Sequence, residues 1–216
     1  MKLFTFWRSS SAYRVRIALA MKGLAYEPQF VHLARAGGEQ HSADFRAKNP
    51  LGQIPVLEVQ AEGASEPVFL SQSLAIIEYL EERFPTPPLM PTDLLARARV
   101  RELAELMNSG IQPFQNLTTT NFLGEVAPDL DKQRWFEKFI AGGLSVLEGR
   151  VRDSAGRFSV ADAVSIADVL LVPQLYAARR LGLSLDRYAT LLRVEAECLK
   201  LDGFVSAHPD RQADRE

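Results

Sequence analysis

Three consecutive serines lie between a strand-like stretch and the apolar face of a helix in the segment Arg8–Leu19. Met1–Phe6 alternates as a strand does, whereas Val15, Ala18 and Leu19 recur at helical spacing. Serine is a preferred N-cap residue, so we expect a helix to begin at the serines. The first N–H groups of a helix lack partners within it, and its N-terminus is the positive end of its dipole. The turn therefore favours a bound anion such as a thiolate.

Composition indicates a globular protein, and the length of 216 residues favours two modest domains. Hydrophobic residues make up 47% and charged residues 24%, which suffices for a sizeable core. The net charge of −2 gives no long-range attraction to nucleic acid or an anionic membrane. No apolar run approaches the roughly 20 residues that span a bilayer, and no signal-peptide core begins the sequence. We expect a cytoplasmic protein that binds neither nucleic acid nor membranes.

The single cysteine, Cys198, excludes an intramolecular disulfide and a cysteine cluster around a metal. It shares a helical face with Leu191 and Val194, which favours a buried structural thiol over a nucleophile. The three histidines lie far apart and lack metal-ligand spacing. We therefore expect no metal site, and a reactive thiol would come from another molecule.

A segment with four prolines, 85–92, divides two different patterns and predicts a semi-rigid linker. Before it, residues 1–84 alternate strand-like and helix-like stretches, which predicts an α/β domain. The expected strands are 2–6, 26–31, 55–59 and 67–70, and the expected helices are 12–22 and 72–84. After it, residues 93–216 show helical spacing and predict an all-helical domain with a polar end that frays.

Two further segments place polar residues where a helix begins. Ser165 and Asp168 match a capping box, with Asp in place of the usual Glu, so their role is in folding. Ser71–Ser73 precedes a helix from Leu74 and forms a second N-terminus that could receive a carboxylate. Serine is a common cap in any globular protein, so a plain N-cap is the simpler interpretation.

Three ambiguous features stay open from the residues alone. Pro55 begins a strand, where a cis bond or an edge position would explain it, although trans bonds dominate by more than about tenfold. Segment 108–120 interrupts a helix with Gly, Pro, amides and hydroxyls, and it predicts a polar lining or a kinked helix equally well. Arg179 and Arg180 fit exposed charges better than carboxylate anchors by spacing.

Four motifs together resemble the zeta class of glutathione transferases, in one register from about residue 1 to about residue 212. They are Ser9–Ala18, Asn49–Pro55, Ser71–Leu80 and Gly110–Asn116. The resemblance implies a glutathione transferase fold: a thioredoxin-like glutathione-binding domain over 1–84, the linker 85–92 and an all-helical substrate domain over 93–216. It also implies a homodimer, and an active site between the two domains of each subunit.

The resemblance assigns roles to particular residues. In the family the Ile54–Pro55 bond is cis, so that the Ile54 backbone pairs with the cysteinyl unit of glutathione, and Gln72 and Ser73 hold the γ-glutamyl end. The expected glutathione contacts are Ser9, Ser10, Ser11, Gln40, Ile54, Gln72, Ser73, Gln112, Asn116 and Thr118. The first three of these are the expected catalytic residues, with Ser9 facing the sulfur. Arg8 and Arg180 are the expected substrate-binding residues, whereas Arg14 and Arg16 are ranked as structural.

The chain departs from the family at two positions. The family commonly has Cys where this chain has Ser11, and Trp where it has Tyr13. Ser11 cannot supply a second thiolate. A mechanism that uses the glutathione sulfur, with Ser9 donating to it, is therefore the one that remains.

The resemblance implies a glutathione-dependent cis–trans isomerase that converts maleylacetoacetate to fumarylacetoacetate in aromatic amino-acid catabolism by reversible thiolate addition. Maleylpyruvate is the close alternative substrate, and Gln112 weighs against it because members acting on it tend to carry His there and arginines near Leu117 and Thr118. A general glutathione transferase, a haloacid dehalogenase and a non-catalytic glutathione-binding dimer module are further candidate functions. Thiol–disulfide exchange is disfavoured because residues 9–12 contain no cysteine.

Overall fold

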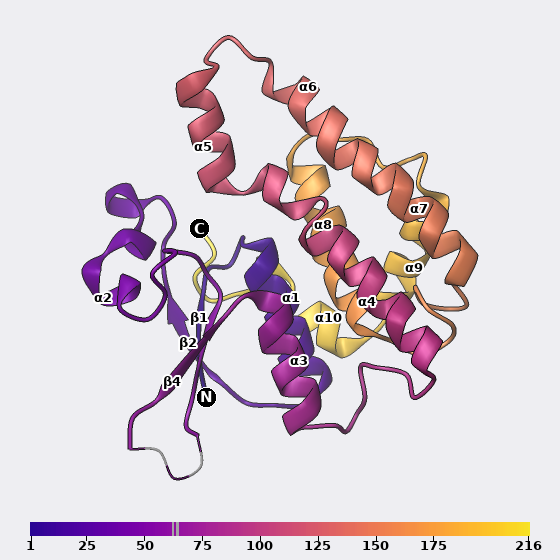
Figure 1. Cartoon of the computed structure of the whole chain (residues 1–216), viewed down its shortest axis with the longest axis horizontal. Coiled ribbons are helices and arrows are strands. Elements are labelled where there is room, and N and C mark those ends of the chain that lie inside the picture. Colours follow the sequence, from indigo (N-terminus) through magenta and orange to yellow (C-terminus); the bar gives the residue numbers. More distant parts are fainter. Residues whose placement is uncertain (62, 64) are drawn as a thin grey trace. The chain divides into compact units, whose positions relative to one another are not determined.

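The computed structural model describes residues 1–61, 63 and 65–216 and forms two compact units. The α/β unit comprises Met1–Pro88 and Leu201–Glu216, and the helical unit comprises Leu89–Lys200 (Figure 1). Among the described helices, none has the length and apolar character needed to cross a membrane. Within the same described residues, His, Cys, Asp and Glu side chains form no group that could hold a metal ion.

A four-stranded mixed sheet organises the α/β unit. Its strands are β1 (Lys2–Thr5), β2 (Glu27–Phe30), β3 (Val56–Val59) and β4 (Val68–Ser71), in the order β2-β1-β3-β4. The pair β1 and β2 is parallel, so it needs a crossover, which α1 (Ser10–Met21) supplies. The other two pairs are antiparallel. The expected mixture of strands and helices is confirmed, with bounds that differ by one or two residues.

Among its described residues, the α/β unit contains three further helices besides α1: α2 (Ala43–Arg46), α3 (Ser73–Arg83) and α10 (Asp202–Ser206). Short 3₁₀ turns cover Arg35–Gly37, Glu39–His41 and Pro209–Arg211. The sequence favours α3 strongly, because Ile76, Ile77 and Leu80 form an apolar stripe and Pro85 follows its end. In the structure this stripe is fully buried. Both α3 and α10 pack against α1.

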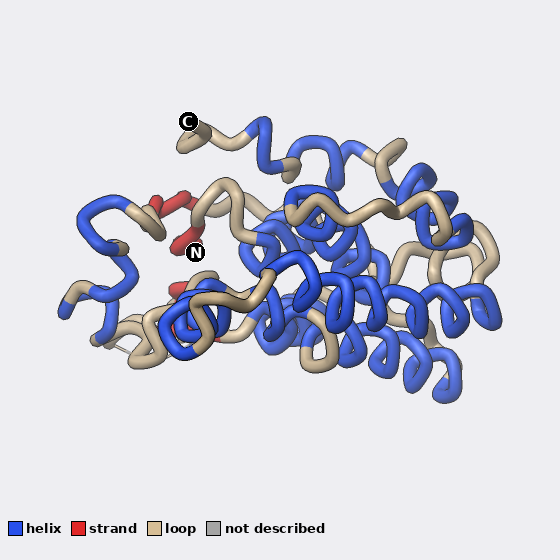
Figure 2. The backbone as a smooth tube through the Cα atoms, turned by 90° about the horizontal axis from the view of Figure 1, so that it is seen from above, coloured by secondary structure: helices blue, strands red, loops and turns tan. Residues whose placement is uncertain are grey.

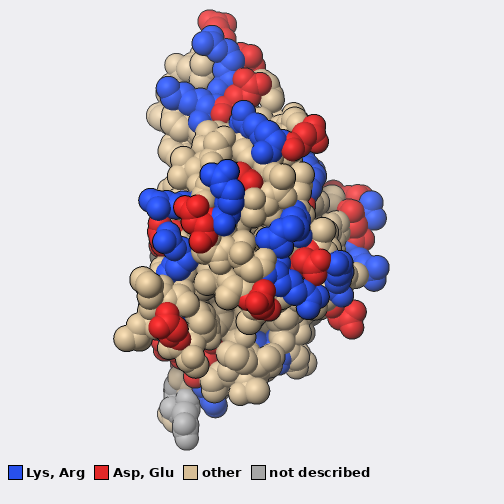
Figure 3. All heavy atoms as spheres, turned by 90° about the vertical axis from the view of Figure 1, so that its right-hand side faces the viewer, with Lys and Arg blue, Asp and Glu red and all other residues tan. Residues whose placement is uncertain are grey.

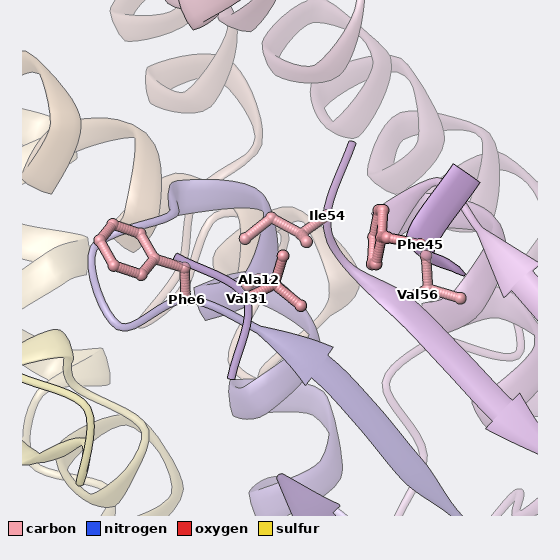
Figure 4. Packing of buried hydrophobic residues seen from close by; sticks show 6 residues of the cluster. All are labelled: Phe6, Ala12, Val31, Phe45, Ile54 and Val56. Atoms are coloured by element: carbon pink, nitrogen blue, oxygen red, sulfur yellow. The ribbon is translucent and has the colours of Figure 1, made fainter. Parts of the chain in front are cut away.

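One apolar cluster joins the end of β1 to the start of α1. Its buried members are Phe6, Ala12, Val31, Phe45, Ile54 and Val56 (Figure 4). Ala12 lies in the first turn of α1 and Ile54 lies just before β3. Close packing of this cluster therefore fixes the first turn of α1 beside the segment that enters β3.

The C-terminal segment differs from the expected domain division, which placed residues 93–216 together. Leu201–Glu216 packs on the α/β unit instead of extending the helical unit. The Tyr13 hydroxyl donates to the carbonyl of Phe204 at 3.4 Å, and Arg16 Nε donates to the carbonyl of Ala207 at 3.2 Å. Both donors are fully buried, so they need acceptors, and the segment provides them. The polar end that the sequence predicts to fray includes a 3₁₀ turn at Pro209–Arg211.

Helices and loops make up the helical unit, drawn blue and tan in Figure 2. Its helices are α4 (Leu94–Asn108), α5 (Leu117–Val126), α6 (Lys132–Phe136), α7 (Gly142–Ser154), α8 (Ile166–Arg180) and α9 (Ala189–Cys198). A 3₁₀ turn covers Gln112–Gln115 and a π-helical turn covers Glu137–Ala141. Cys198 is fully buried, and burial raises the pKa of its thiol, as a structural thiol requires.

The predicted capping box forms at the start of α8, which is buried along most of its length. Asp168 accepts from the backbone N–H groups of Ser165 and Ser159, each at 2.8 Å. Burial raises the pKa of Asp168, and the hydrogen bonds from both serines oppose that shift. The carboxyl group thus satisfies two buried backbone donors at once.

Charged side chains of both signs are interspersed on the face drawn in Figure 3. This matches the near balance of 25 basic and 27 acidic residues in the sequence. The extended basic surface typical of nucleic-acid binding is not present on this face.

Replacing Asp168 by alanine should lower the free energy of unfolding by about 1–3 kcal/mol, because two buried N–H groups lose their acceptor. Chemical denaturation followed by circular dichroism measures this change. The matched control is Asp153→Ala on the exposed side of α7, which should change stability by no more than about 0.5 kcal/mol. Equal stability of the two variants would contradict the role of the capping box.

Candidate active site

The turn between β1 and α1 presents several hydrogen-bond donors at one helix end. Ser9 is the N-cap of α1, and its Oγ accepts from the N–H of Ala12 at 3.2 Å. This bond uses a lone pair, so the hydroxyl proton stays available to a ligand. The N–H groups of Ser10 and Ser11 have no backbone acceptor among the described residues. The expected helix start is confirmed, and three donors converge where an anion is favoured.

A buried guanidinium supports this turn from the protein interior. Arg16 is 1% exposed and donates to Thr5 Oγ1 at 3.1 Å, to the carbonyl of Phe6 at 3.3 Å and to the carbonyl of Trp7 at 2.9 Å. Its Nε donates to Ala207. These contacts give Arg16 a structural role, as expected.

The start of α3 is a second helix N-terminus in the same unit. Gln72 precedes it with φ 69° and ψ 113°, and no side chain caps the helix. A positive φ is strained for glutamine, and such strain clusters at ligand-binding sites. Ser73 is buried, and its Oγ accepts from Nη1 of the fully buried Arg14 at 3.2 Å. Arg14 therefore links α1 to the first residue of α3 and adds positive charge there.

Two candidate residues precede β3. The Ile54–Pro55 bond is cis, which the residues alone did not favour and the family resemblance implied. The backbone of Ile54 makes no hydrogen bond to the described part of the chain. Gln40 is buried; its Nε2 donates to the carbonyl of Leu33 at 3.3 Å, and its Oε1 is buried without a partner among those residues. The carbonyl of Gln40 lies beside Gly52, so these two loops are neighbours.

The remaining candidates for glutathione contacts lie in the helical unit. Gln112 begins the 3₁₀ turn after α4, and Asn116 is the N-cap of α5, where its Oδ1 accepts from the N–H of Thr118 at 3.0 Å. Gln115 Oε1 accepts from the fully buried Gln174 at 3.1 Å. Segment 108–120 is thus a helix end, a 3₁₀ turn and a new helix. The amide of Asn116 serves the backbone here, whereas the 3₁₀ turn that begins at Gln112 has no side-chain cap.

Both candidate substrate-binding arginines are exposed and lie over aromatic rings. The guanidinium carbon of Arg8 is 5.5 Å from the ring centroid of Trp7, and that of Arg180 is 5.8 Å from the ring centroid of Tyr176. Such stacking orients a guanidinium.

The structure therefore places the predicted site residues in two groups. The α/β unit holds Arg8, Ser9, Ser10, Ser11, Gln40, Ile54, Gln72 and Ser73, and the helical unit holds Gln112, Asn116, Thr118 and Arg180. Sequence reasoning missed the contact of Arg14 with Ser73 and the contact of Asp214 with the N–H of Trp7. These partners are far apart in sequence, so no local pattern could have shown them.

Comparison with known proteins identifies the family of this chain. The family model described as "Glutathione S-transferase, N-terminal domain" matches residues 1–82. A protein of Vibrio cholerae named "Probable maleylacetoacetate isomerase" is 44% identical, over 98% of this chain and 97% of its own length.

Solved structures extend the comparison to the whole chain. A maleylacetoacetate isomerase from Anaeromyxobacter dehalogenans, with glutathione bound in its active site, is 53% identical with a TM-score of 0.90, over 100% of this chain and 97% of that one. A maleyl pyruvate isomerase, described as a bacterial glutathione S-transferase in the zeta class, is 38% identical with a TM-score of 0.91 over 100% of both chains. With this similarity over its full length, the chain belongs to the zeta class of glutathione transferases.

Proposed function

We propose that this protein is a glutathione-dependent cis–trans isomerase that converts maleylacetoacetate to fumarylacetoacetate. The observation that carries the proposal is the turn from β1 to α1, where the Ser9 hydroxyl and the free N–H groups of Ser10 and Ser11 meet at a helix N-terminus. This arrangement suits a thiolate, and the chain itself offers no accessible thiol. The names of its relatives supply the reaction.

The groups around the turn fit glutathione. The unpaired backbone of Ile54 matches a peptide that pairs as an added strand. The uncapped start of α3, with Gln72, Ser73 and the nearby charge of Arg14, matches the carboxylate of the γ-glutamyl end. The buried Oε1 of Gln40 offers an acceptor to an N–H group of the tripeptide. We propose Gln112, Asn116 and Thr118 as further contacts from the helical unit.

Ser9 is the largest contributor to activating the thiol. A free thiol has a pKa of about 8.5, so lowering it by about 1.5 units requires roughly 2 kcal/mol. A helix N-terminus contributes about 0.3–1 kcal/mol, whereas a hydrogen bond to a charged acceptor contributes about 1.5–3 kcal/mol. The hydroxyl therefore stabilises the thiolate more than the helix N-terminus does. Ser10 and Ser11 assist through their backbone N–H groups, and Ser11 does so without a thiol of its own.

When bound, glutathione supplies a thiolate that adds reversibly to the cis double bond and leaves after rotation. Ser9 donates its hydroxyl proton to the sulfur in a hydrogen bond and so holds it ionised before attack. Arg8 and Arg180 hold the substrate carboxylate and the oxygen on which negative charge develops, since a guanidinium binds such oxygens bidentately.

Maleylpyruvate is the second candidate substrate, because two solved relatives are named for it. Gln112 stands where enzymes of that type tend to carry histidine, which favours maleylacetoacetate. Haloacid dehalogenation is a side activity that the same thiolate would allow.

The proposal is tested with purified protein and each maleyl substrate, with and without glutathione, by following the isomer ratio and total thiol. We expect isomerisation that requires glutathione and leaves total thiol unchanged, with a higher kcat/KM for maleylacetoacetate. Thiol consumption would indicate conjugation instead, and no change in either quantity would indicate a non-catalytic module. The variant Ser9→Ala should lose at least about tenfold in kcat/KM.

Ser9 also caps α1, so its effect on the stability of the helix must be separated from its effect on the glutathione thiol. The variant Ser9→Thr keeps a hydroxyl and should keep activity. Asp93→Ala removes a comparable cap, in which Asp93 Oδ1 accepts from the N–H of Ala96 at 2.8 Å. It should lower stability by about 0.5–2 kcal/mol and leave kcat/KM unchanged. An equal loss of activity in Asp93→Ala and Ser9→Ala would refute the role of the hydroxyl.

Gln72→Gly should change stability and binding in opposite directions. Glycine adopts a positive φ without strain, so the free energy of unfolding should rise by about 1 kcal/mol. Glutathione affinity should fall, because the side chain that holds the γ-glutamyl end is removed. Ala36→Gly is the matched control, since Ala36 also has a positive φ of 53° and lies on an exposed turn. Denaturation and calorimetric titration measure the two effects, and unchanged affinity in Gln72→Gly would remove Gln72 from the site.

We also propose that the protein is a cytoplasmic homodimer, as the family resemblance implies. Leu94 and Leu95 at the start of α4 are 81% and 77% exposed, and adjacent exposed apolar side chains are typical of interfaces. Sedimentation equilibrium should give twice the monomer mass of 24.1 kDa, and a value equal to the monomer mass would contradict the dimer.

A further inference from the structure

We propose that the C-terminal strap, Ala207–Glu216, positions the catalytic turn, and that Asp214 is the positioning residue that acts on it. This inference rests on the proposed function, because it assigns the strap a role in placing Ser9. The strap belongs to the α/β unit although it ends the chain. Figures 1 and 2 show the C-terminus returning to that unit.

The first contact is between the strap and the residue that begins the turn. The backbone N–H of Trp7 donates to Asp214 Oδ2 at 2.8 Å. Trp7 directly precedes Arg8 and Ser9, so this bond sets the direction in which the chain leaves β1. The acceptor is a carboxylate, and such hydrogen bonds are about twice as strong as neutral ones.

The second contact holds the same residue from its other side. Arg16 donates to the carbonyl of Trp7 and, through Nε, to the carbonyl of Ala207 at the start of the strap. Trp7 is thus held at its N–H by Asp214 and at its carbonyl by Arg16. One side chain of the strap and one guanidinium that contacts the strap together fix the backbone before Ser9.

Charge couples these groups. Burial raises the pKa of Tyr26, while the positive charge of Arg16 lowers it and the negative charge of Asp214 raises it. Asp214 and Arg16 therefore both influence the pKa of Tyr26. Asp214 Oδ1 is also buried and has no partner among the described residues, so the carboxyl group is enclosed by the fold and does not project into solvent.

The last residue of the strap, Glu216, contributes less to positioning the turn. Glu216 contacts His32 at 3.2 Å and Arg35 at 2.8 Å. Glu216 and Arg35 are both exposed, and surface ion pairs contribute little. Positioning therefore depends on Asp214 and the Ala207 carbonyl rather than on the terminal residue.

A shift of the turn would move the Ser9 hydroxyl away from the sulfur that it stabilises, and small misplacements near the reacting group are costly. The test compares Asp214→Ala with Asp210→Ala. Both variants remove one negative charge from the strap, but Asp210 contacts His208 and Arg215 instead of the turn. Each variant is assayed for kcat/KM, for the pKa of the thiol of bound glutathione by thiolate absorbance, and for thermal stability.

We expect Asp214→Ala to lower kcat/KM by about tenfold and to raise the pKa of the bound thiol by about one unit. Asp210→Ala should match the wild type. Asp214→Asn, whose Oδ1 can still accept from Trp7, should recover most of the loss. If Asp214→Ala does not fold, Asp214→Glu keeps the charge on a longer side chain and should show the same rise in thiol pKa.

The inference is overturned if folded Asp214→Ala or Asp214→Glu has the thiol pKa and kcat/KM of the wild type. A change in thermal stability without a change in thiol pKa also overturns it, because the strap would then only stabilise the fold. A wild-type protein that binds glutathione and lacks isomerase activity would refute the proposed function alone, since the thiol pKa still reports on the turn. A wild-type protein that does not bind glutathione would refute both.

Discussion

The candidate site depends on the hydrogen bonds made by the buried guanidinium of Arg16. A charge removed from water is costly unless hydrogen bonds compensate it. Here Thr5, Phe6 and Trp7 at the end of β1, and Ala207 near the C-terminus, supply four acceptors. Meeting this requirement brings the last residues of β1 and the C-terminal segment to the same helix. The backbone before Ser9 is therefore fixed by the hydrogen bonds that the buried Arg16 side chain requires.

Two helix N-termini of the α/β unit give the site its electrostatic character. The starts of α1 and α3 both leave backbone N–H groups without partners in the helix. A tripeptide with a thiolate at one position and a carboxylate at another matches two such ends. Arg14 joins them physically, because it belongs to α1 and contacts Ser73 at the start of α3. In the proposed function, ionisation of the sulfur and binding of the γ-glutamyl end would thus depend on α1 and α3 together.

The two departures from the family pattern affect different parts of this arrangement. Tyr13 is fully buried, and its hydroxyl faces the carbonyl of Phe204 in α10. It therefore serves the docking of the C-terminal segment. Ser11 lies in the first turn of α1, half-buried, with its backbone N–H available. The loss of a cysteine there leaves the helix end and the Ser9 hydroxyl intact, which is why the bound thiol alone carries the proposed chemistry.

Local physical chemistry in the sequence determined the elements and their ends. Ser9 before α1, Asp93 before α4 and the box of Ser165 and Asp168 before α8 all act within one helical turn, so neighbouring residues suffice to predict them. Tertiary structure alone decided that Leu201–Glu216 joins the α/β unit, that Arg14 contacts Ser73 and that Asp214 contacts Trp7. Those partners are separated by 59 and 207 positions. These pairs form because hydrogen-bond donors that become buried on folding need acceptors within the protein. No short-range sequence pattern encodes that requirement.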